Sequence, residues 1–291
     1  TTFPEVLKSN GFKTGYTGKG WAPGVAMKDG KKRDLIGELY KEKTLTPPAS
    51  FISNVDYFEN FKLFLDGKSE DQPFFFWVGG HEPHRAYEYK AGLKKGKKNI
   101  NEIDRVPDYW PNSDNVKTDM LDYAFEIEYF DRHLVDILQE LEKRNLLENT
   151  IVVVTSDNGM PFPRVKSQVY PFDNRLPLAI RWGKGIKNPG RVISDYFSFS
   201  DFAPTFLEIA NIEIPKEMNS NSFLDLLISP KEGNISNKRN SVIMGRERHA
   251  FVREAGKGYP GRAIRTEEFL YIRNYNPERW PAGDPPLYGD V

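Results

Sequence analysis

The chain has 291 residues, with 41 basic and 41 acidic side chains and no cysteine. The charge balance argues against a nucleic-acid-binding surface as the main feature, and the lack of cysteine excludes disulfides and thiolate chemistry within this segment. No apolar run reaches the roughly 18 residues that a membrane-spanning helix needs. An aromatic content of 13% can supply a sizeable core, so the length suits one large globular domain or one and a half.

The chain opens with a predicted helix at residues 3–8, which Gly11 ends, and a predicted strand at residues 12–16. The strand leads to Lys19, which has a glycine on each side. A lysine at such a strand end can bring its ammonium into an anion site. A solvated surface lysine is the alternative, because lysine is usually exposed.

Residues 55–65 are predicted as a helix and the apolar run PFFFWV at residues 73–78 as a buried strand. The strand leads into GGHEPHR, which contains His81 and His84. Histidine is the usual side chain for proton transfer near neutral pH, and a histidine that only closes a turn is the alternative. The polar residues 86–117 are expected to form a lid or a binding insertion, and their lysines a solvated face.

Residues 118–144 are predicted as a long helix, because apolar side chains recur at helical spacing and Thr118 or Asp119 can cap its start. The β-branched run at residues 151–154 is predicted as a strand buried on both faces of a parallel sheet. A helix between two such strands indicates a βαβ crossover.

Asp157 and Asn158 follow this strand directly. Ligands gather beyond the carboxyl ends of strands in open α/β sheets, and carboxylate and amide oxygens are hard ligands that suit Ca²⁺ or Mg²⁺. An Asx-turn that closes the strand is the alternative. The next segment, PFPRVKSQVYPFDN, is predicted to be extended because of its prolines, and it brings Arg164 and Lys166 near the same strand end.

The second half of the chain is predicted to alternate short strands with one helix. These elements are a strand at 176–182, a helix at 200–210, a strand at 241–244, and a hairpin at 262–266 and 269–273, before a tail rich in proline and glycine at 277–291. The whole pattern predicts an α/β fold with a central, mostly parallel sheet flanked by helices and the start of a small antiparallel C-terminal subdomain. The expected domain limits are residues 1–257 and 258–291.

Four motifs in this order carry a resemblance to a known family: TGYTGKGW, PFFFWVGGHEPHR, EIEYFDRHL and SDNGMPFPRVK. The chain resembles a sulfatase of the alkaline phosphatase superfamily from residue 1 to about residue 273. The longer motifs are most similar to the N-sulfoglucosamine sulfohydrolase branch and its bacterial relatives. This resemblance implies the alkaline phosphatase-like fold and the hydrolytic removal of sulfate from a sulfated saccharide, with N-sulfoglucosamine of heparan-type glycosaminoglycans favoured.

The resemblance also implies a role for individual residues. Asp157 and Asn158 match Ca²⁺ ligands of the family, while Lys19 and Lys166 match lysines that contact the sulfate. His81 matches the histidine that contacts the sulfate and serves the leaving group. The resemblance also implies four substrate-pocket residues: His84, Arg85, Glu247 and His249. Of these, His84 is equally compatible with a structural role.

Two departures from the family pattern stand out. Trp21 occupies a position where many sulfatases have a histidine. The family nucleophile, a formylglycine made from Cys or Ser in a C/S-x-P-x-R motif, is missing together with an Asp-Asp metal pair; in the family both lie upstream of this segment. We therefore expect an internal piece of a longer sulfatase, which needs a formylglycine-generating maturation enzyme and is inactive as an isolated polypeptide.

Three alternatives stay open at this point: an O-sulfatase acting on another glycan, a phosphoryl-transfer enzyme of the same superfamily, and a non-catalytic protein that binds sulfated glycans. His133 lies inside the long helix, so few histidines are left for the second metal of a phosphoryl-transfer site. The resemblance implies a periplasmic or secreted bacterial protein, or a lysosomal one in an animal. No nucleic-acid partner and no membrane span are expected, and the sequence leaves the oligomeric state open.

Overall fold

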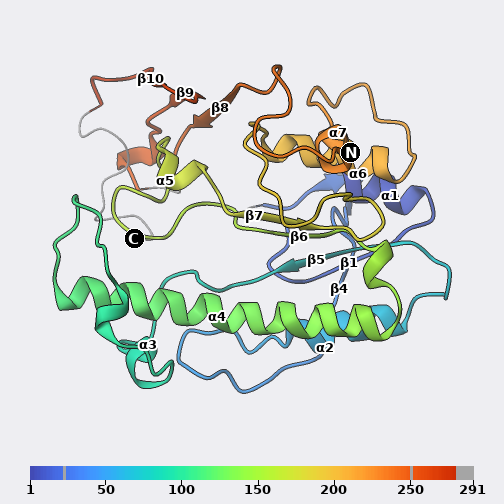
Figure 1. Cartoon of the computed structure of the whole chain (residues 1–291), viewed down its shortest axis with the longest axis horizontal. Helices are drawn as coiled ribbons and strands as arrows, with labels where there is room; N and C mark the ends of the chain where they lie inside the picture. Colours follow the sequence, from blue (N-terminus) through green and yellow to red (C-terminus); the bar gives the residue numbers. More distant parts are fainter. Residues whose placement is uncertain (22–23, 250–251, 280–291) are drawn as a thin grey trace. The chain divides into compact units, whose positions relative to one another are not determined.

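The structure is a computed structural model that describes residues 1–21, 24–249 and 252–279 (Figure 1). The chain forms two compact units, Thr1–Asn145 and Leu146–Val291, which are described separately below. None of the helices in the described part of the chain is both long enough and apolar enough to cross a membrane. The domain limits expected from the sequence stay a prediction, and most of the predicted tail lies outside the described residues.

The first unit contains a parallel three-stranded sheet with the order β4-β1-β5. Its strands are β1 (Lys13–Gly18), β4 (Glu38–Leu39) and β5 (Phe74–Gly79). Strands β1 and β5 pair in register from Lys13 opposite Phe74 to Gly18 opposite Gly79, so they end together. This confirms the predicted parallel sheet. Strand β5 is less covered than predicted, since most of its side chains are half-buried and Trp77 is exposed.

The long helix α4 (Asp114–Lys143) dominates the first unit and packs against α2 (Tyr57–Asp66) and α3 (Ala91–Lys94) (Figure 1). It begins earlier than predicted, because the Ser113 hydroxyl accepts the Val116 N–H and caps the helix. The predicted cap Thr118 is instead buried within the helix. The other short elements are α1 (Phe3–Ser9), β2 (Met27–Lys28), β3 (Lys31–Lys32) and the 3₁₀ turn η1 (Ile100–Glu102).

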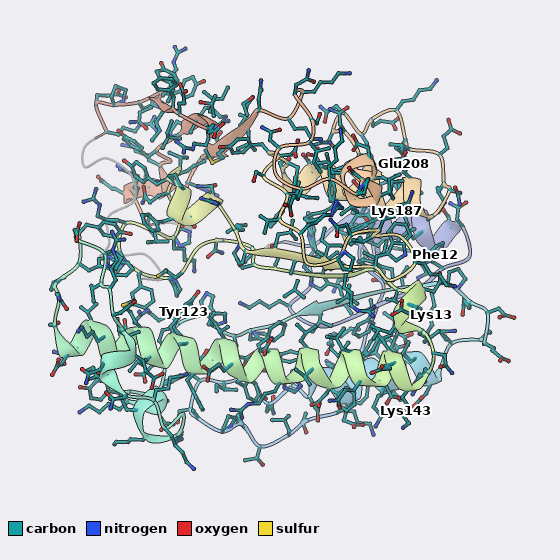
Figure 2. All side chains as sticks on the ribbon, viewed as in Figure 1. Phe12, Lys13, Tyr123, Lys143, Lys187 and Glu208 are labelled. Carbon is teal, nitrogen blue, oxygen red and sulfur yellow. The ribbon has the colours of Figure 1, made fainter. Side chains whose placement is uncertain are left out.

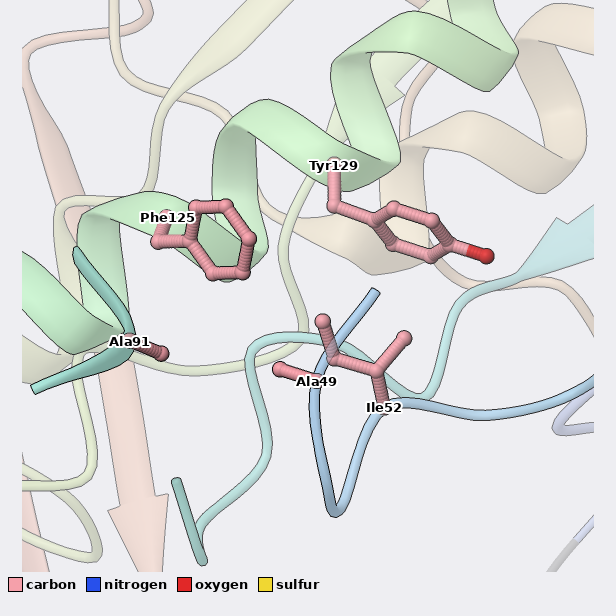
Figure 3. Close-up of a cluster of buried hydrophobic side chains, with 5 residues drawn as sticks. All are labelled: Ala49, Ile52, Ala91, Phe125 and Tyr129. Carbon is pink, nitrogen blue, oxygen red and sulfur yellow. The ribbon is translucent and has the colours of Figure 1, made fainter. Parts of the chain in front are cut away.

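A compact apolar cluster joins α4 to the segments beside it (Figure 3). Phe125 and Tyr129 lie one turn apart on the same face of α4, as residues spaced by four do. They pack against Ala49, Ile52 and Ala91, and all five side chains are buried. The residues predicted as an irregular insertion are therefore partly fixed, because α3 supplies Ala91 to this core.

A partly buried hydrogen bond from a lysine side chain also joins β1 to α2. Lys13, labelled in Figure 2 at the start of β1, donates from its ammonium to the Phe64 carbonyl at 2.8 Å. The same ammonium lies 4.9 Å from the centre of the Phe64 ring. The lysine stem thus crosses the aromatic layer between strand and helix, and this contact fixes the start of β1 against α2.

The second unit contains two antiparallel sheets. Strand β6 (Val152–Thr155) pairs with β7 (Leu178–Arg181), and β8 (Ser241–Arg246), β9 (Gly261–Thr266) and β10 (Leu270–Asn274) form a second sheet in the order β10-β9-β8. The predicted hairpin and the small antiparallel sheet are confirmed. The helical elements of this unit are α5 (Pro171–Asn174), α6 (Phe202–Ile209), α7 (Leu224–Ile228), η2 (Leu147–Asn149), η3 (Phe199–Asp201) and η4 (Glu254–Gly256).

Two predictions for this unit are wrong. The run at 151–154 is not a buried strand of a parallel sheet, because β6 runs antiparallel to β7 and its valines are half-buried. The segment between these strands is not extended either. It folds into turns and α5, and Arg164 and Ser167 adopt positive φ angles of 68° and 65°. Proline restricts mainly its own φ and the residue before it, which leaves the other residues free to turn.

Candidate active site

Lys19 and His81 lie at neighbouring carboxyl ends of the parallel sheet. The Lys19 N–H donates to the Gly79 carbonyl at 2.6 Å, and the Trp77 indole N–H donates to the Lys19 carbonyl at 3.1 Å. The β1–β5 register therefore continues one residue beyond the strands. Both side chains start from the same sheet edge, as the strand ends in the sequence predict.

Two glycines allow this close approach of the strand ends. Gly18 has φ of 73°, and a Cβ there would lie 2.1 Å from the Gly79 carbonyl oxygen. A Cβ on Gly79 would lie 1.9 Å from the Lys19 carbonyl oxygen. Any larger residue at either position would push the two strand ends apart.

The surroundings of His81 favour its neutral form. Desolvation by the surrounding protein lowers the pKa of His81, and the nearby Lys19 ammonium lowers this pKa further. The carboxylate of Glu82 acts in the opposite direction, whereas His84 again lowers the His81 pKa. The effect of Lys19 on this pKa reflects the closeness of the two side chains.

The predicted pocket residues His84 and Arg85 make local contacts in the first unit. The His84 N–H donates to the His81 carbonyl at 2.9 Å, and His84 Nδ1 lies 2.6 Å from the Arg85 carbonyl oxygen. The Arg85 guanidinium forms two bonds, of 3.1 and 2.5 Å, with the Asp119 carboxylate on α4. These contacts fix the turn after His81, while the substrate roles stay predictions.

In the second unit, Asp157 and Asn158 occupy a turn directly after β6. Asp157 is exposed and Asn158 is half-buried. The Ser156 hydroxyl donates to the Asn158 carbonyl at 3.1 Å, and the Gly159 N–H donates to Asp173 Oδ1 at 2.9 Å. Besides the local Ser156 contact, the turn is thus held by the carboxylate of Asp173, which lies 14 residues after Gly159 in the sequence.

Asp173 is the organising residue of this loop and was not predicted from the sequence. Its buried carboxylate accepts the N–H groups of Gly159 and Gln168, each at 2.9 Å. Burial raises the pKa of Asp173, whereas these backbone donors and then the Lys166 ammonium lower it. An aspartate in a loop rich in proline and polar residues carries no sequence pattern that distinguishes it from a surface turn.

The end of β8 is bonded to the segment that contains Lys166. His249 Nδ1 and the Ser167 hydroxyl oxygen are 2.6 Å apart, and the Arg246 guanidinium donates to Gln168 Oε1 at 3.2 Å. The second unit thus brings His249 close to the predicted sulfate-contacting Lys166, which precedes Ser167.

Glu247 lines a pocket in the second unit, and its carboxylate pairs with Arg262, while its substrate role stays a prediction. The other pocket residues are Arg248, Gly256, Gly258, Pro260 and Arg279.

The donors at the end of β6 suit one side of a calcium site. Calcium takes six to eight oxygen ligands, and Asp157 and Asn158 offer a carboxylate and an amide oxygen. Within residues 1–21, 24–249 and 252–279, no three His, Asp or Glu side chains come together in a way that could hold a metal. Asp157 and Asn158 could therefore supply two of the oxygen ligands, and the calcium site stays a prediction.

Comparison with known proteins gives consistent matches. The Sulfatase family matches residues 1–212, and the C-terminal family of N-sulphoglucosamine sulphohydrolase matches residues 165–284. The chain is similar to an ulvan-active sulfatase of Formosa agariphila, with 38% identity over 60% of this chain and 27% of the relative. It is also similar to human N-sulphoglucosamine sulphohydrolase, with 25% identity over 71% of this chain and 45% of the relative.

A solved structure described as a complex with its substrate D-glucosamine-2-N,6-O-disulfate has a similar fold. It is 20% identical, with a TM-score of 0.68, and the match covers 95% of this chain and 73% of that one. The chain spans less than half the length of the two curated relatives. Because the Sulfatase family matches most of the sequence, the chain belongs to the sulfatase family.

Proposed function

We propose that the protein hydrolyses a sulfate ester or sulfamate on a sulfated saccharide, with N-sulfoglucosamine as the favoured substrate. The observation that carries this proposal is the placement of Lys19 and His81 at one sheet edge, where an exposed lysine ammonium lies near a histidine and lowers its pKa. The match of residues 165–284 to the N-sulphoglucosamine sulphohydrolase C-terminal family supports the choice of sugar.

The side chains have complementary tasks in this proposal. Lys19 binds the sulfate oxygens, a role that the family resemblance also gives to Lys166. An anion held by Lys19 offsets the ammonium charge, so the bound substrate favours protonated His81. His81 then donates its proton to the leaving nitrogen or oxygen, which avoids expulsion of a strongly basic anion.

The proposal includes two groups that this chain does not supply alone. Asp157 and Asn158 would hold Ca²⁺, which as a bound cation stabilises negative charge on sulfate oxygens. Formylglycine from an upstream Cys or Ser, formed by a maturation enzyme, would supply the nucleophile. Export to the periplasm or the cell exterior, or to the lysosome in an animal, belongs to the same proposal.

The test uses the full-length protein matured with a formylglycine-generating system. Sulfate release is measured from N-sulfoglucosamine and from 6-O-sulfated glucosamine, with and without a chelator. Release from the N-sulfated sugar is expected, with a loss of about 100-fold or more in Lys19→Ala and His81→Ala. Lys8→Ala is the matched control, because Lys8 is an exposed lysine of the same unit on α1.

Other outcomes would change the proposal in defined ways. Release only from the 6-O-sulfated sugar would replace the sulfamidase by an O-sulfatase. Absence of sulfate release from either sugar, with retained binding of sulfated glycans, would favour the non-catalytic alternative. Activity that survives both the chelator and Asp157→Ala would contradict the calcium site.

A further inference from the structure

A buried tyrosine connects the two strand ends that present Lys19 and His81. Tyr57 is the first residue of α2, and its side chain is fully buried. Its hydroxyl accepts the His81 backbone N–H at 3.0 Å and donates to Glu82 Oε2 at 2.8 Å. The hydroxyl therefore holds the main chain of His81 itself, immediately beyond the end of β5.

The Tyr57 ring also lies against the end of β1. A Cβ placed on Gly18 would lie 2.9 Å from Tyr57 Cε1, so the ring touches the residue just before Lys19. The rings of Phe130 and His133 on α4 contact the same tyrosine, with centroids 5.7 and 5.1 Å away. Helix α4 thus supports the ring from behind, and few alternative positions are open to it.

Glu82 completes this arrangement. Its buried carboxylate accepts the Tyr57 hydroxyl through one oxygen and the Ser53 N–H, at 2.6 Å, through the other. A buried carboxylate with two donors is well anchored, and it fixes the direction in which the Tyr57 hydroxyl donates its proton. The lone pair of the hydroxyl is then aimed at the His81 N–H.

We propose that Tyr57, anchored by Glu82, is a positioning residue that holds His81 at its working distance from Lys19. This inference rests on the proposed sulfatase function for its catalytic consequence, but its structural content can be measured without activity. The groups that face His81 are the Lys19 ammonium, the Glu82 carboxylate and the His84 imidazole. A displaced His81 would therefore change its interaction with all three.

The chain offers a matched control for the tyrosine hydroxyl. Tyr40 is also buried, also donates to a glutamate, at 2.8 Å to Glu38, and also packs on the aromatic residues under the sheet. Within the described part of the chain its hydroxyl bonds to Glu38 and to no site residue, and β4 lies on the opposite side of β1 from β5. Tyr57→Phe and Tyr40→Phe each remove a hydroxyl that a buried tyrosine donates to a glutamate, which is buried for Tyr57 and exposed for Tyr40.

The experiment compares Tyr57→Phe, Tyr40→Phe and the unchanged full-length enzyme. In Tyr57→Phe we expect kcat for sulfate release to fall about tenfold with KM changed less than about twofold, whereas Tyr40→Phe retains both. The His81 pKa, followed by NMR and identified through His81→Asn, should rise toward its usual value only in Tyr57→Phe. A Tyr57→Phe enzyme with unchanged kcat and unchanged His81 titration would overturn the inference.

Backbone hydrogen exchange separates this inference from the proposed function and from failure to fold. In the unchanged protein the His81 amide should exchange as slowly as the β5 amides, because Tyr57 is its acceptor. Fast exchange there would overturn the inference even if Tyr57→Phe cannot be purified. If the enzyme releases no sulfate from any sugar, the proposed function fails, while the exchange and titration results still decide the role of Tyr57.

Discussion

The two regions that present the predicted site residues are stabilised in different ways. In the first unit, the regular pairing of β1 with β5 positions Lys19 and His81, and the hydroxyl of buried Tyr57 accepts the His81 N–H just beyond the strand ends. In the second unit, the turn after β6 and the segment with Lys166 have no sheet hydrogen bonds. One buried carboxylate, Asp173, holds both.

This difference has an energetic consequence. A sheet is stabilised by many backbone hydrogen bonds, so the loss of one bond changes the free energy of unfolding little. A loop whose N–H groups share one carboxylate loses several hydrogen bonds when that carboxylate is removed. The second region should therefore be the more fragile one toward a single substitution. Four substitutions, described in order of decreasing effect, test this comparison.

Asp173→Ala should have the largest effect. Its removal leaves the Gln168 N–H without its acceptor, leaves the Gly159 N–H with only the backbone carbonyl of residue 173, and removes the buried carboxylate that joins the two segments, which should lower the free energy of unfolding by about 3–5 kcal/mol. Denaturant unfolding measures this loss, and the calcium concentration needed for sulfate release should rise because the Asp157 turn loosens.

Asp195→Ala is the control for this change. Asp195 is equally buried in the second unit and accepts the N–H groups of Ile235 and Ser236 at 2.8 and 2.7 Å. Its loss should destabilise the protein to a similar extent without a change in calcium dependence. An identical shift of calcium dependence in both variants would show that general destabilisation, and not the Asp173 loop, is responsible.

Gly18→Ala should have the next largest effect and tests the sheet region. The positive φ of Gly18 and the contact of its Cβ position with the Gly79 carbonyl should together cost about 2–4 kcal/mol. Gly11→Ala is the control, because Gly11 has φ of 88° but open space around its Cβ position, so only about 1 kcal/mol is expected. Equal losses in thermal unfolding would mean that the close approach of the strand ends contributes nothing.

Glu126→Gln tests a pH effect confined to the first unit. Burial, followed by the charges of Glu82 and Asp122, raises the pKa of Glu126 from 4.5 to about 8. Neither carboxyl oxygen of this buried side chain has a hydrogen-bond partner within the described part of the chain.

The direction follows from the two pKa values. Below pH 4.5 both the folded and the unfolded state are protonated at Glu126, so this group causes no loss of stability there. Between pH 4.5 and about 8 the unfolded state ionises more readily, and the free energy of unfolding falls as the pH rises. Glu126→Gln should remove roughly 1–3 kcal/mol of this decline, measured by urea unfolding at pH 5 and pH 8. Glu128→Gln, on the exposed face of α4, should leave the decline unchanged.

Arg85→Lys should have the smallest effect. Lysine cannot reproduce the two-bond contact with Asp119, but the pair is partly exposed, so a loss of about 0.5–1 kcal/mol is expected. Asp119→Asn should produce a similar loss. If Arg85→Lys raises KM for the sulfated sugar while Asp119→Asn does not, Arg85 contacts substrate directly, as the family resemblance implies.

The sequence by itself determined the fold class and the order of the site residues. The predicted strands at residues 12–16 and 73–78 correspond to β1 and β5, and their ends carry Lys19 and His81 as expected. Periodic apolar residues and strand-end polar residues are local patterns, so a single sequence can reveal them. The family motifs, which are also short and contiguous, could be recognised for the same reason.

Only the tertiary structure decided which groups hold these residues. The antiparallel pairing of β6 with β7, the gathering of the loop around Asp173 and the bond from Tyr57 to His81 all join residues distant in sequence. Tyr57 resembles an ordinary core residue of an amphipathic helix, and Asp173 an ordinary turn residue. Their roles depend on burial beside particular backbone N–H groups, which is a property of the packed chain that local patterns do not contain.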